Sequence, residues 1–337
     1  MLSLKKQLSD APDAPDGHSF GERFRAWWDG YELEARPAAA SGKATGGLDE
    51  EHSGDSEFSE SDVGESGSGA ADRYPPLDRS SPWPETRRKI AQLVWGDGFV
   101  VPGDAASITD LVQAFCLDSS SNMLEIGSGA GGGTRAIATQ FGAYVAGFDI
   151  EQELCDAATD EAKVHSLDQQ AAVRPLDLDK FEFKSEYYIG ALIHDTLYRV
   201  PDKKAFFQKV VEAIKPGAQM VILDLFFADD AATSEMDRWR DGERSEAYGW
   251  QIEEAQKILG KMSVEIRITT DESDAYCTKI RETWQNFVRN VDEFPLPDEL
   301  VLPMIDEAEF WARRVAAIQS GGLKLCRMSC IKSREVA

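Results

Sequence analysis

The sequence predicts an α/β protein with a doubly wound, Rossmann-like sheet of seven strands, a helical lid and a disordered N-terminal arm. Three observations predict this fold class. From Ser81 onward, short apolar runs alternate with amphipathic stretches, a pattern that indicates parallel strands joined by helices. A glycine-rich stretch directly follows one of these runs, as it does where a strand turns sharply into a helix. Two strands with alternating polarity lie near the C-terminal end.

Length and composition limit the class of protein. The chain has 337 residues and a formal net charge of −24, which fits one enzyme domain with an extension. This excess of acid argues against nucleic acid or an anionic membrane surface as the main partner. The 5 cysteines form no CxxC and the 4 histidines are scattered, so no metal site is predicted. Since no apolar leader and no apolar run of about 20 residues is visible, we expect a cytoplasmic protein without a membrane span.

Residues 1–80 are predicted to form an acidic, flexible arm. Its segment Ser41–Ala71 is rich in glycine, serine and acid, and it buries too little apolar surface to offset the entropy of ordering. Within the arm, residues 20–33 carry five aromatic side chains at helical spacing and predict a short helix. This helix has three interpretations: a latch on the protein's own surface, a docking element for a protein partner, or a membrane-adsorbing segment. The acidic surroundings disfavour the third.

The catalytic domain is predicted over residues 81–337, and its elements follow in order. The first half contains the helix Ser107–Phe115, the strand Asn122–Ile126, a helix ending near Phe141, the strand Tyr144–Ile150, the helix Gln152–His165 and a third strand that ends at Asp177-Leu178. The second half contains the strand Tyr187–Ile193, the helix Lys203–Ile214, a turn at Lys215–Gly217, the strand Gln219–Leu225, a lid over residues 226–260, and the strands Ser263–Thr269 and Leu323–Ile331 with two helices between them.

The glycine-rich stretch LEIGSGAGGG (residues 124–133) predicts a nucleotide-binding loop. Gly127 and Gly129 fit both the GxGxxG pattern of dinucleotide sites and the GxGxG pattern of S-adenosylmethionine sites. Asp149 ends the next strand, where a carboxylate can hold ribose hydroxyls in either case. The glycines alone therefore leave two cofactor classes open, and a tight turn without a ligand is a third reading.

Three further features favour S-adenosylmethionine. Glu125 lies two residues before the first glycine, where its charge suits a cationic sulfonium better than a pyrophosphate. Asp177 and Leu178 follow the third strand, where a carboxylate can accept the hydrogens of an adenine amino group. The turn Lys215–Gly217 precedes the fifth strand, as is common in methyltransferases. We therefore expect this cofactor.

The sequence also resembles a known family. The segments WGDGFV (95–100), LEIGSGAGGG, FGAYVAGFDI (141–150), HDTLYRVPDKKAFF (194–207) and IKPGAQMVILDL (214–225) are similar to class I S-adenosylmethionine-dependent methyltransferases, and most similar to the phosphoethanolamine N-methyltransferase group. The resemblance spans roughly residues 83–335. It implies methyl transfer to a small molecule, but it specifies the class better than the substrate.

The resemblance implies roles for individual residues. It implies that the cofactor is bound by Glu125, Gly127, Ser128, Gly129, Asp149, Ile150, Asp177, Leu178 and His194. The family's catalytic tyrosine and histidine fall on Trp83 and Arg199 here. Neither replacement can act as an acid or base, because tryptophan has no titratable proton and arginine stays charged.

The acceptor side is predicted from chemistry that methyl transfer needs. Asp195 follows the fourth strand and is expected to orient the nucleophile or the cofactor, although it could serve only as a helix cap. Arg199 is expected to meet an anionic group, or else to form a surface ion pair. Aromatic and arginine side chains that could cage an ammonium group or clamp an anion are Trp83, Arg244, Tyr248, Trp250 and Trp284. The tryptophans could equally fill a local core. The helix Asp274–Asn290, which carries Trp284 and Tyr276, is expected to form a second wall.

The sequence thus predicts an S-adenosylmethionine-dependent methyltransferase that acts on a small polar metabolite, most readily at an amine nitrogen. Two alternatives remain open. The chain could be a non-catalytic S-adenosylmethionine-binding regulator, because the family's catalytic pair is missing. It could also methylate a protein that is recruited through the N-terminal helix.

Overall fold

The computed structural model describes residues 22, 25, 26, 28, 74–228, 233–291 and 296–334. Its centre is a seven-stranded sheet with the order β3-β2-β1-β4-β5-β7-β6. The strands are β1 (Asn122–Ile126), β2 (Tyr144–Asp149), β3 (Ala171–Pro175), β4 (Tyr188–His194), β5 (Ile214–Phe227), β6 (Val264–Asp271) and β7 (Leu323–Lys332). β7 runs antiparallel to β5 and to β6, whereas the other pairings are parallel. This confirms the predicted doubly wound sheet of seven strands.

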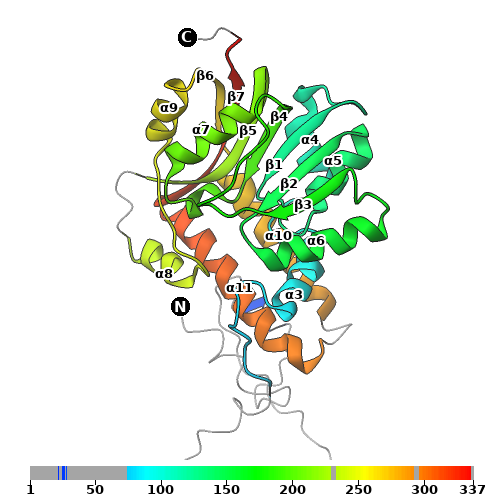
Figure 1. Cartoon of the computed structure of the whole chain (residues 1–337). Helices are drawn as coiled ribbons and strands as arrows, with labels where there is room; N and C mark the ends of the chain where they lie inside the picture. Colours follow the sequence, from blue (N-terminus) through cyan, green and yellow to red (C-terminus); the bar gives the residue numbers. More distant parts are fainter. Residues whose placement is uncertain are drawn as a thin grey trace, which may run out of the picture.

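Helices cover both faces of the sheet and one of its ends. They are α3 (Glu85–Trp95), α4 (Ala105–Val112), α5 (Gly132–Phe141), α6 (Gln152–Val164), α7 (Lys203–Ala213), α8 (Ser234–Gly242), α9 (Ile252–Gly260), α10 (Ser273–Val291) and α11 (Asp298–Gln319). Figure 1 shows α3, α8 and α11 gathered below the sheet, at the end where β1 and β4 lead into the loops described below.

Alternation along β1 explains why the sheet has two cores. Leu124 and Ile126 point to one face and pack with side chains of α7 and α9, whereas Met123 points to the other face and packs with α4 and α5. Successive side chains of a strand point to opposite faces, so a strand buried on both sides reads as one continuous apolar run.

A third core lies between the helices at the end of the sheet. It contains tryptophans from four helices, namely Trp95, Trp239, Trp284 and Trp311, together with Leu225 and Leu325 from the strand ends. The rings of Trp95 and Trp311 meet edge to face, with centroids 4.9 Å apart. α3, α8, α10 and α11 are therefore held as one helical cap over the carboxyl ends of the parallel strands.

Two local predictions differ from the structure. Lys215–Gly217 was expected as a turn, but it lies inside β5, where the pairing with β4 jumps from Ile214 to Gln219. The proline and the glycine are accommodated as an irregularity of the strand. The predicted lid over residues 226–260 is divided: α8 packs against α11 in the helical cap, whereas α9 packs against β6 at the edge of the sheet.

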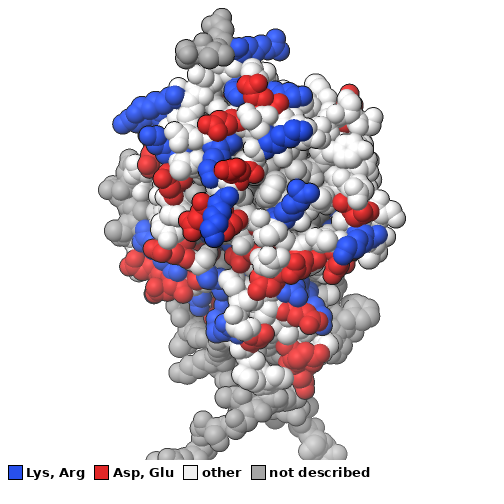
Figure 2. Space-filling model, in the orientation of Figure 1, with Lys and Arg blue, Asp and Glu red and all other residues white. Residues whose placement is uncertain are grey.

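The N-terminal arm lies outside the described residues except for residues 22, 25, 26, 28 and 74–80, so its predicted flexibility stays a prediction. Trp28 stacks on Trp284 of α10 with ring centroids 5.6 Å apart. None of the helices in the described ranges is long and apolar enough to cross a membrane. Acidic and basic side chains are interspersed over the visible face of the described part, so this face carries no continuous basic surface (Figure 2).

Candidate active site

The glycine-rich loop joins β1 to α5 and is shaped by close backbone contacts. Gly127 has φ +88°, and a Cβ atom at this position would lie 1.9 Å from the carbonyl oxygen of His194. Only glycine can therefore occupy this position, both for its conformation and for the space available. The loop is held directly against the end of β4.

A second turn covers the loop from the other side. Gly98, in the turn after α3, accepts a backbone hydrogen bond from Gly132 at 3.0 Å. A Cβ atom on Gly132 would come within 2.8 Å of the Gly98 backbone. The segment WGDGFV, which was recognised by resemblance, thus packs on the glycine loop.

Asp149 ties the loop to the end of β2. Its carboxylate is almost fully buried; Oδ2 accepts a hydrogen bond from the Gly129 backbone at 2.8 Å and Oδ1 accepts one from Glu151 at 2.9 Å. Because the carboxyl ends of β1 and β2 lie side by side, Asp149 reaches the loop although 20 residues separate it from Gly129.

Glu125 supports the loop from beneath. It is fully buried, accepts a hydrogen bond from Thr134 at 2.5 Å, and lies 3.2 Å from Nε2 of His194. Burial alone would lower the pKa of His194, but the hydrogen bond to Glu125 and its negative charge outweigh burial and raise that pKa above its ordinary value. Glu125 is not among the residues that line the pocket beside the glycine-rich loop. Its carboxylate therefore stabilises the loop from within and does not face the pocket.

Two neighbouring pockets lie at this end of the sheet. We call the first the glycine-loop pocket; it is lined by Gly127, Ser128, Gly129, Asp149, His194, Tyr276 and residues of the 98–103 turn, among others. We call the second the arginine pocket, since it is lined by Arg87, Arg199, Arg244 and Arg314 together with Glu151, Glu243, Tyr198, Phe310 and Trp311. The two pockets share one wall, made of Trp83, Val100, Val101, Asp195 and Arg199.

Asp195 stands in this shared wall in an unusual backbone conformation. Its φ is +44°, in the left-handed region that residues other than glycine rarely adopt. Its N–H donates to Leu223 of β5 at 3.1 Å, and its carboxylate accepts a hydrogen bond from Arg314 at 3.1 Å. Such a conformation persists only where the surroundings enforce it, and it is common at functional sites.

Asp224 enforces the conformation of the segment that follows Asp195. This fully buried carboxylate of β5 accepts backbone hydrogen bonds from Thr196 and Leu197 at 2.8 Å each and from Tyr198 at 3.2 Å. Burial, assisted by the like charge of Asp195, raises the pKa of Asp224 to about 6, although the backbone donors oppose this shift. Sequence reasoning missed this residue because its partners lie more than 25 residues away.

Arg314 of α11 is the central cation of the site and was also missed. It is fully buried and donates to Asp195 at 3.1 Å, to Glu243 at 2.9 Å, and to the hydroxyl groups of Tyr198 and Tyr276 at 3.0 and 3.3 Å. A buried guanidinium group needs such carboxylate partners, because an unpaired charge in the interior is costly. The charges of Arg314 and Asp195 therefore hold α11 and the end of β4 together.

Like Asp195, the residues Trp83 and Arg199 were predicted for the acceptor side and line both pockets. Trp83 is buried and lies against Arg87, whose guanidinium carbon is 3.7 Å from the ring centroid. Arg199 donates to Glu151 at 2.7 Å, and both side chains are nearly buried. Burial raises the pKa of Glu151 although the charge of Arg199 opposes the shift. The alternative of a solvated ion pair for Arg199 is therefore wrong.

Several residues predicted for the acceptor side lie elsewhere. Trp250 fills the core between β5 and α7, stacked on Phe226 at 4.9 Å, and Trp284 belongs to the core of the helical cap. Tyr248 donates to Glu246 outside both pockets. The structure thus places these three outside both pockets: the rings of Trp250 and Trp284 pack in apolar cores, as the local-core alternative for the tryptophans expects, and Tyr248 bonds to Glu246. Arg244, by contrast, lines the arginine pocket and pairs with Asp306.

The residues predicted to contact adenine lie near the pocket but do not line it. Asp177 is exposed in the turn after β3, where it accepts a hydrogen bond from Asp179 at 3.1 Å. Ile150 and Leu178 are partly buried against the core of the α7 face. Their assignment to the cofactor stays a prediction.

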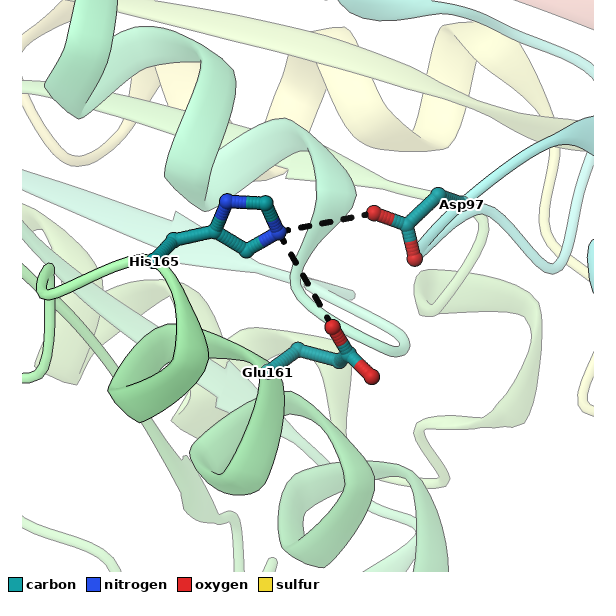
Figure 3. A group of neighbouring side chains, drawn as sticks. All are labelled: Asp97, Glu161 and His165. Carbon is teal, nitrogen blue, oxygen red and sulfur yellow. Dashed lines mark ion pairs between the residues drawn. The ribbon is translucent and has the colours of Figure 1, made fainter.

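One further cluster of polar side chains lies outside both pockets. Asp97, Glu161 and His165 converge at the surface, with Nε2 of His165 3.8 Å from Asp97 and 3.9 Å from Glu161 (Figure 3). These atoms are close enough for a shared cation. However, the cluster is largely exposed and Asp97 also pairs with Arg135 at 3.3 Å. We assign it no role in the reaction.

Comparison with known proteins agrees with this architecture. Residues 123–217 match the family model described as a methyltransferase domain. Phosphoethanolamine N-methyltransferase 1 of Zea mays is 24% identical over 210 residues, which cover 60% of this chain and 40% of that protein. The corresponding enzyme of Plasmodium falciparum is 23% identical over 67% of this chain and 84% of its own length. The chain thus spans less than half of the maize relative.

Solved structures show the same fold. Phosphoethanolamine N-methyltransferase 2 of Haemonchus contortus, solved with S-adenosylhomocysteine and phosphomonomethylethanolamine, superposes with a TM-score of 0.64 at 17% identity, over 73% of this chain and 56% of that one. A protein of Galdieria sulphuraria described as a putative sarcosine dimethylglycine methyltransferase gives a TM-score of 0.60 at 14% identity, over 75% and 98% of the two chains.

Proposed function

We propose that this chain, which has the class I S-adenosylmethionine-dependent methyltransferase fold and is related to the phosphoethanolamine N-methyltransferases, transfers a methyl group from S-adenosylmethionine to an amine nitrogen of a small polar metabolite. One observation carries the proposal: two pockets of different character meet at a single wall that contains Asp195. Methyl transfer needs a cofactor and an acceptor on opposite sides of such a point, because the displacement is in line.

The glycine-loop pocket suits the cofactor. Its lining includes the glycine-rich loop at Gly127 and Gly129 and the Asp149 residue at the end of β2. S-adenosylmethionine would supply an electrophilic methyl group on a cationic sulfur. The leaving thioether needs no acid, so the residues of the chain contribute alignment and exclusion of water.

The arginine pocket suits an acceptor that carries an anionic group. The Nε atoms of Arg199, Arg244 and Arg314 are buried and have no hydrogen-bond partner among the residues that the structure describes. Buried donors without a partner are costly, and an anionic ligand would satisfy them. The maize and Plasmodium relatives act, by name, on phosphoethanolamine, an amine with a phosphate group. We therefore propose an amine that also bears a carboxylate or a phosphate.

A wider polar pocket adjoins the arginine pocket and shares Arg87, Glu243 and Arg244 with it. Arg79 and Arg244 both pair with Asp306 at its rim. We propose that a polar acceptor enters from this side, away from the cofactor.

The proposal is tested in two steps. Calorimetry should show that the full chain binds S-adenosylmethionine and S-adenosylhomocysteine. Methyl-labelled S-adenosylmethionine is then incubated with a panel of phosphoethanolamine, ethanolamine, glycine, sarcosine and dimethylglycine. We expect turnover of at least one acceptor that carries an anion, and its loss in Asp195→Ala. The exposed Arg267→Ala on β6 serves as the control for Arg199→Ala, which should raise the acceptor KM. No binding of either cofactor form would refute the proposal.

The same data distinguish the two alternatives. Cofactor binding without turnover of any small amine would favour a regulator. Turnover of a protein that disappears when residues 1–73 are deleted would favour recruitment through the arm. Unchanged kinetics on a small acceptor after that deletion would support the proposal.

A further inference from the structure

Arg314 links one hydroxyl group and one carboxylate that face the glycine-loop pocket together. A single nitrogen of Arg314, Nη1, donates to Asp195 at 3.1 Å and to the hydroxyl oxygen of Tyr276 at 3.3 Å. Tyr276 lies in the first turn of α10, whereas Asp195 follows β4. Both side chains line the glycine-loop pocket, and Arg314, to which both are bonded, lines the arginine pocket, so the two oxygens lie where the two pockets meet. A guanidinium group thus holds together two oxygen groups that come from different elements of the fold.

We propose that Tyr276 is a further catalytic residue, whose hydroxyl oxygen accepts a hydrogen bond from an N–H of the acceptor amine while the Asp195 carboxylate accepts another. This inference rests on the function proposed above. Because Arg314 already occupies one lone pair on each oxygen, the remaining lone pairs are the ones available to a ligand. When these two fixed acceptors hold two N–H groups of the amine, the lone pair of its nitrogen points toward the methyl group of the cofactor.

The protonation state of Tyr276 decides what kind of help it gives. Burial raises the pKa of Tyr276 well above its ordinary value, although the charge of Arg314 opposes the shift. The other charged groups around Arg314 are Asp195 and Glu243, and both carboxylates also disfavour an ionised tyrosine. The hydroxyl group therefore keeps its proton at neutral pH, and it orients the nucleophile without acting as a base.

The transfer step is balanced without a further reactant. The acceptor nitrogen forms the N–C bond while the C–S bond breaks, and the electron pair of that bond stays on sulfur. The nitrogen then carries the positive charge, and it loses one proton to the Asp195 carboxylate and from there to water. Tyr276 neither gains nor loses a proton.

Tyr198 provides an internal comparison. Its hydroxyl group is also bonded to Arg314, through Nη2 at 3.0 Å, and it donates to Glu243 at 3.3 Å. Tyr198 lines the arginine pocket and not the glycine-loop pocket. Removing either hydroxyl takes one hydrogen bond from Arg314, but only the removal of the Tyr276 hydroxyl takes an acceptor from the methyl-transfer position.

The experiment compares Tyr276→Phe, Tyr198→Phe and the control Tyr187→Phe. Tyr187 directly precedes β4, and its hydroxyl donates to Asn122 at the start of β1, outside both pockets. The acceptor is the amine of the panel above that the unaltered chain turns over fastest. We expect Tyr276→Phe to lower kcat/KM for this acceptor by roughly 10- to 100-fold, the effect of one hydrogen bond to a group that becomes charged. Calorimetric affinity for S-adenosylhomocysteine should stay within about twofold, and the shape of the pH profile should stay the same.

Other outcomes overturn the inference. Wild-type kcat/KM in Tyr276→Phe would show that the hydroxyl group does not touch the acceptor. A loss in Tyr198→Phe that equals the loss in Tyr276→Phe and falls on kcat in both variants would place the effect on Arg314, whereas a loss confined to the acceptor KM in Tyr198→Phe reflects the arginine pocket that Tyr198 lines. A loss of S-adenosylhomocysteine affinity that matches the loss of kcat/KM would indicate a structural role. Unchanged turnover in all three variants would overturn this inference but leave the proposed function intact. Cofactor binding without turnover of any amine by the unaltered chain would overturn both proposals.

Discussion

Lowering the pH from 7.5 to 5 should make the folded chain more stable through one carboxylate, Asp224. Burial and the charge of Asp195 raise the pKa of Asp224 from 3.8 to about 6. The folded state therefore binds this proton more tightly than the unfolded state. Its contribution to the free energy of unfolding is complete below the unfolded pKa and is lost as the pH rises through about 6.

The magnitude follows from the two pKa values. The difference between 3.8 and about 6 corresponds to about 3 kcal/mol over the whole titration, and to about 1.4 kcal/mol between pH 7.5 and pH 5. The Asp224 carboxylate accepts the backbone hydrogen bonds that hold residues 196–198. Protonation turns one of its acceptor positions into a donor, so the turn that carries Arg199 should loosen. Methyl transfer should thus weaken below about pH 6 while the fold gains stability.

The assay is urea unfolding at several pH values between 5 and 7.5, for the wild type and for Asp224→Asn, which removes the titrating group. The free energy of unfolding of the wild type minus that of the variant should be about 1.4 kcal/mol larger at pH 5 than at pH 7.5. Asp160→Asn, an exposed carboxylate of α6, is the control and should run parallel to the wild type. If the difference between the wild type and the Asp224→Asn variant stays constant, or grows with rising pH, then a raised pKa of Asp224 does not stabilise the fold at low pH.

Three further predictions test the loop and the corrected assignments. Gly127→Ala should abolish binding of S-adenosylhomocysteine in calorimetry, because a Cβ atom would lie 1.9 Å from the His194 carbonyl oxygen; retained affinity would contradict the tight fit. Glu125→Gln should lower the pKa of His194, as measured by NMR titration of its imidazole, since the carboxylate raises it; an unchanged or higher pKa would show another cause. Trp250→Ala should lower the free energy of unfolding by about 3–5 kcal/mol with the affinity for S-adenosylhomocysteine unchanged. A weakened affinity at intact stability would place Trp250 in the site after all.

The sheet and the loop could be predicted because both follow from local pattern. Each buried strand reads as a short apolar run, and the glycines at 127 and 129 directly follow one. Asp149 could be placed beside them, since neighbouring parallel strands end at the same edge of the sheet. These inferences needed no knowledge of distant contacts.

The wall and the cation of the site could not be predicted in this way. Arg314 lies in a long helix in which a charged residue ordinarily indicates the solvated face. Its burial follows from Asp195 and Glu243, which are 119 and 71 residues away in the chain. Trp250 and Trp284 present the opposite difficulty. The sequence indicates that such large apolar side chains can be buried, but it does not specify which core they join. The sequence pattern indicates whether an apolar side chain is buried, whereas the tertiary packing determines which residues it is buried against.

The wall that the two pockets share also has a thermodynamic consequence. Any shift of Asp195 or Arg199 that improves the fit of one occupant changes the fit of the other, since the same two side chains belong to both pockets. Linkage requires this influence to be reciprocal, so the factor by which a bound cofactor product alters acceptor affinity equals the factor by which the acceptor alters product affinity. The affinity of each occupant would then depend on the other through the five residues of the shared wall, with no second conformation of the whole fold required.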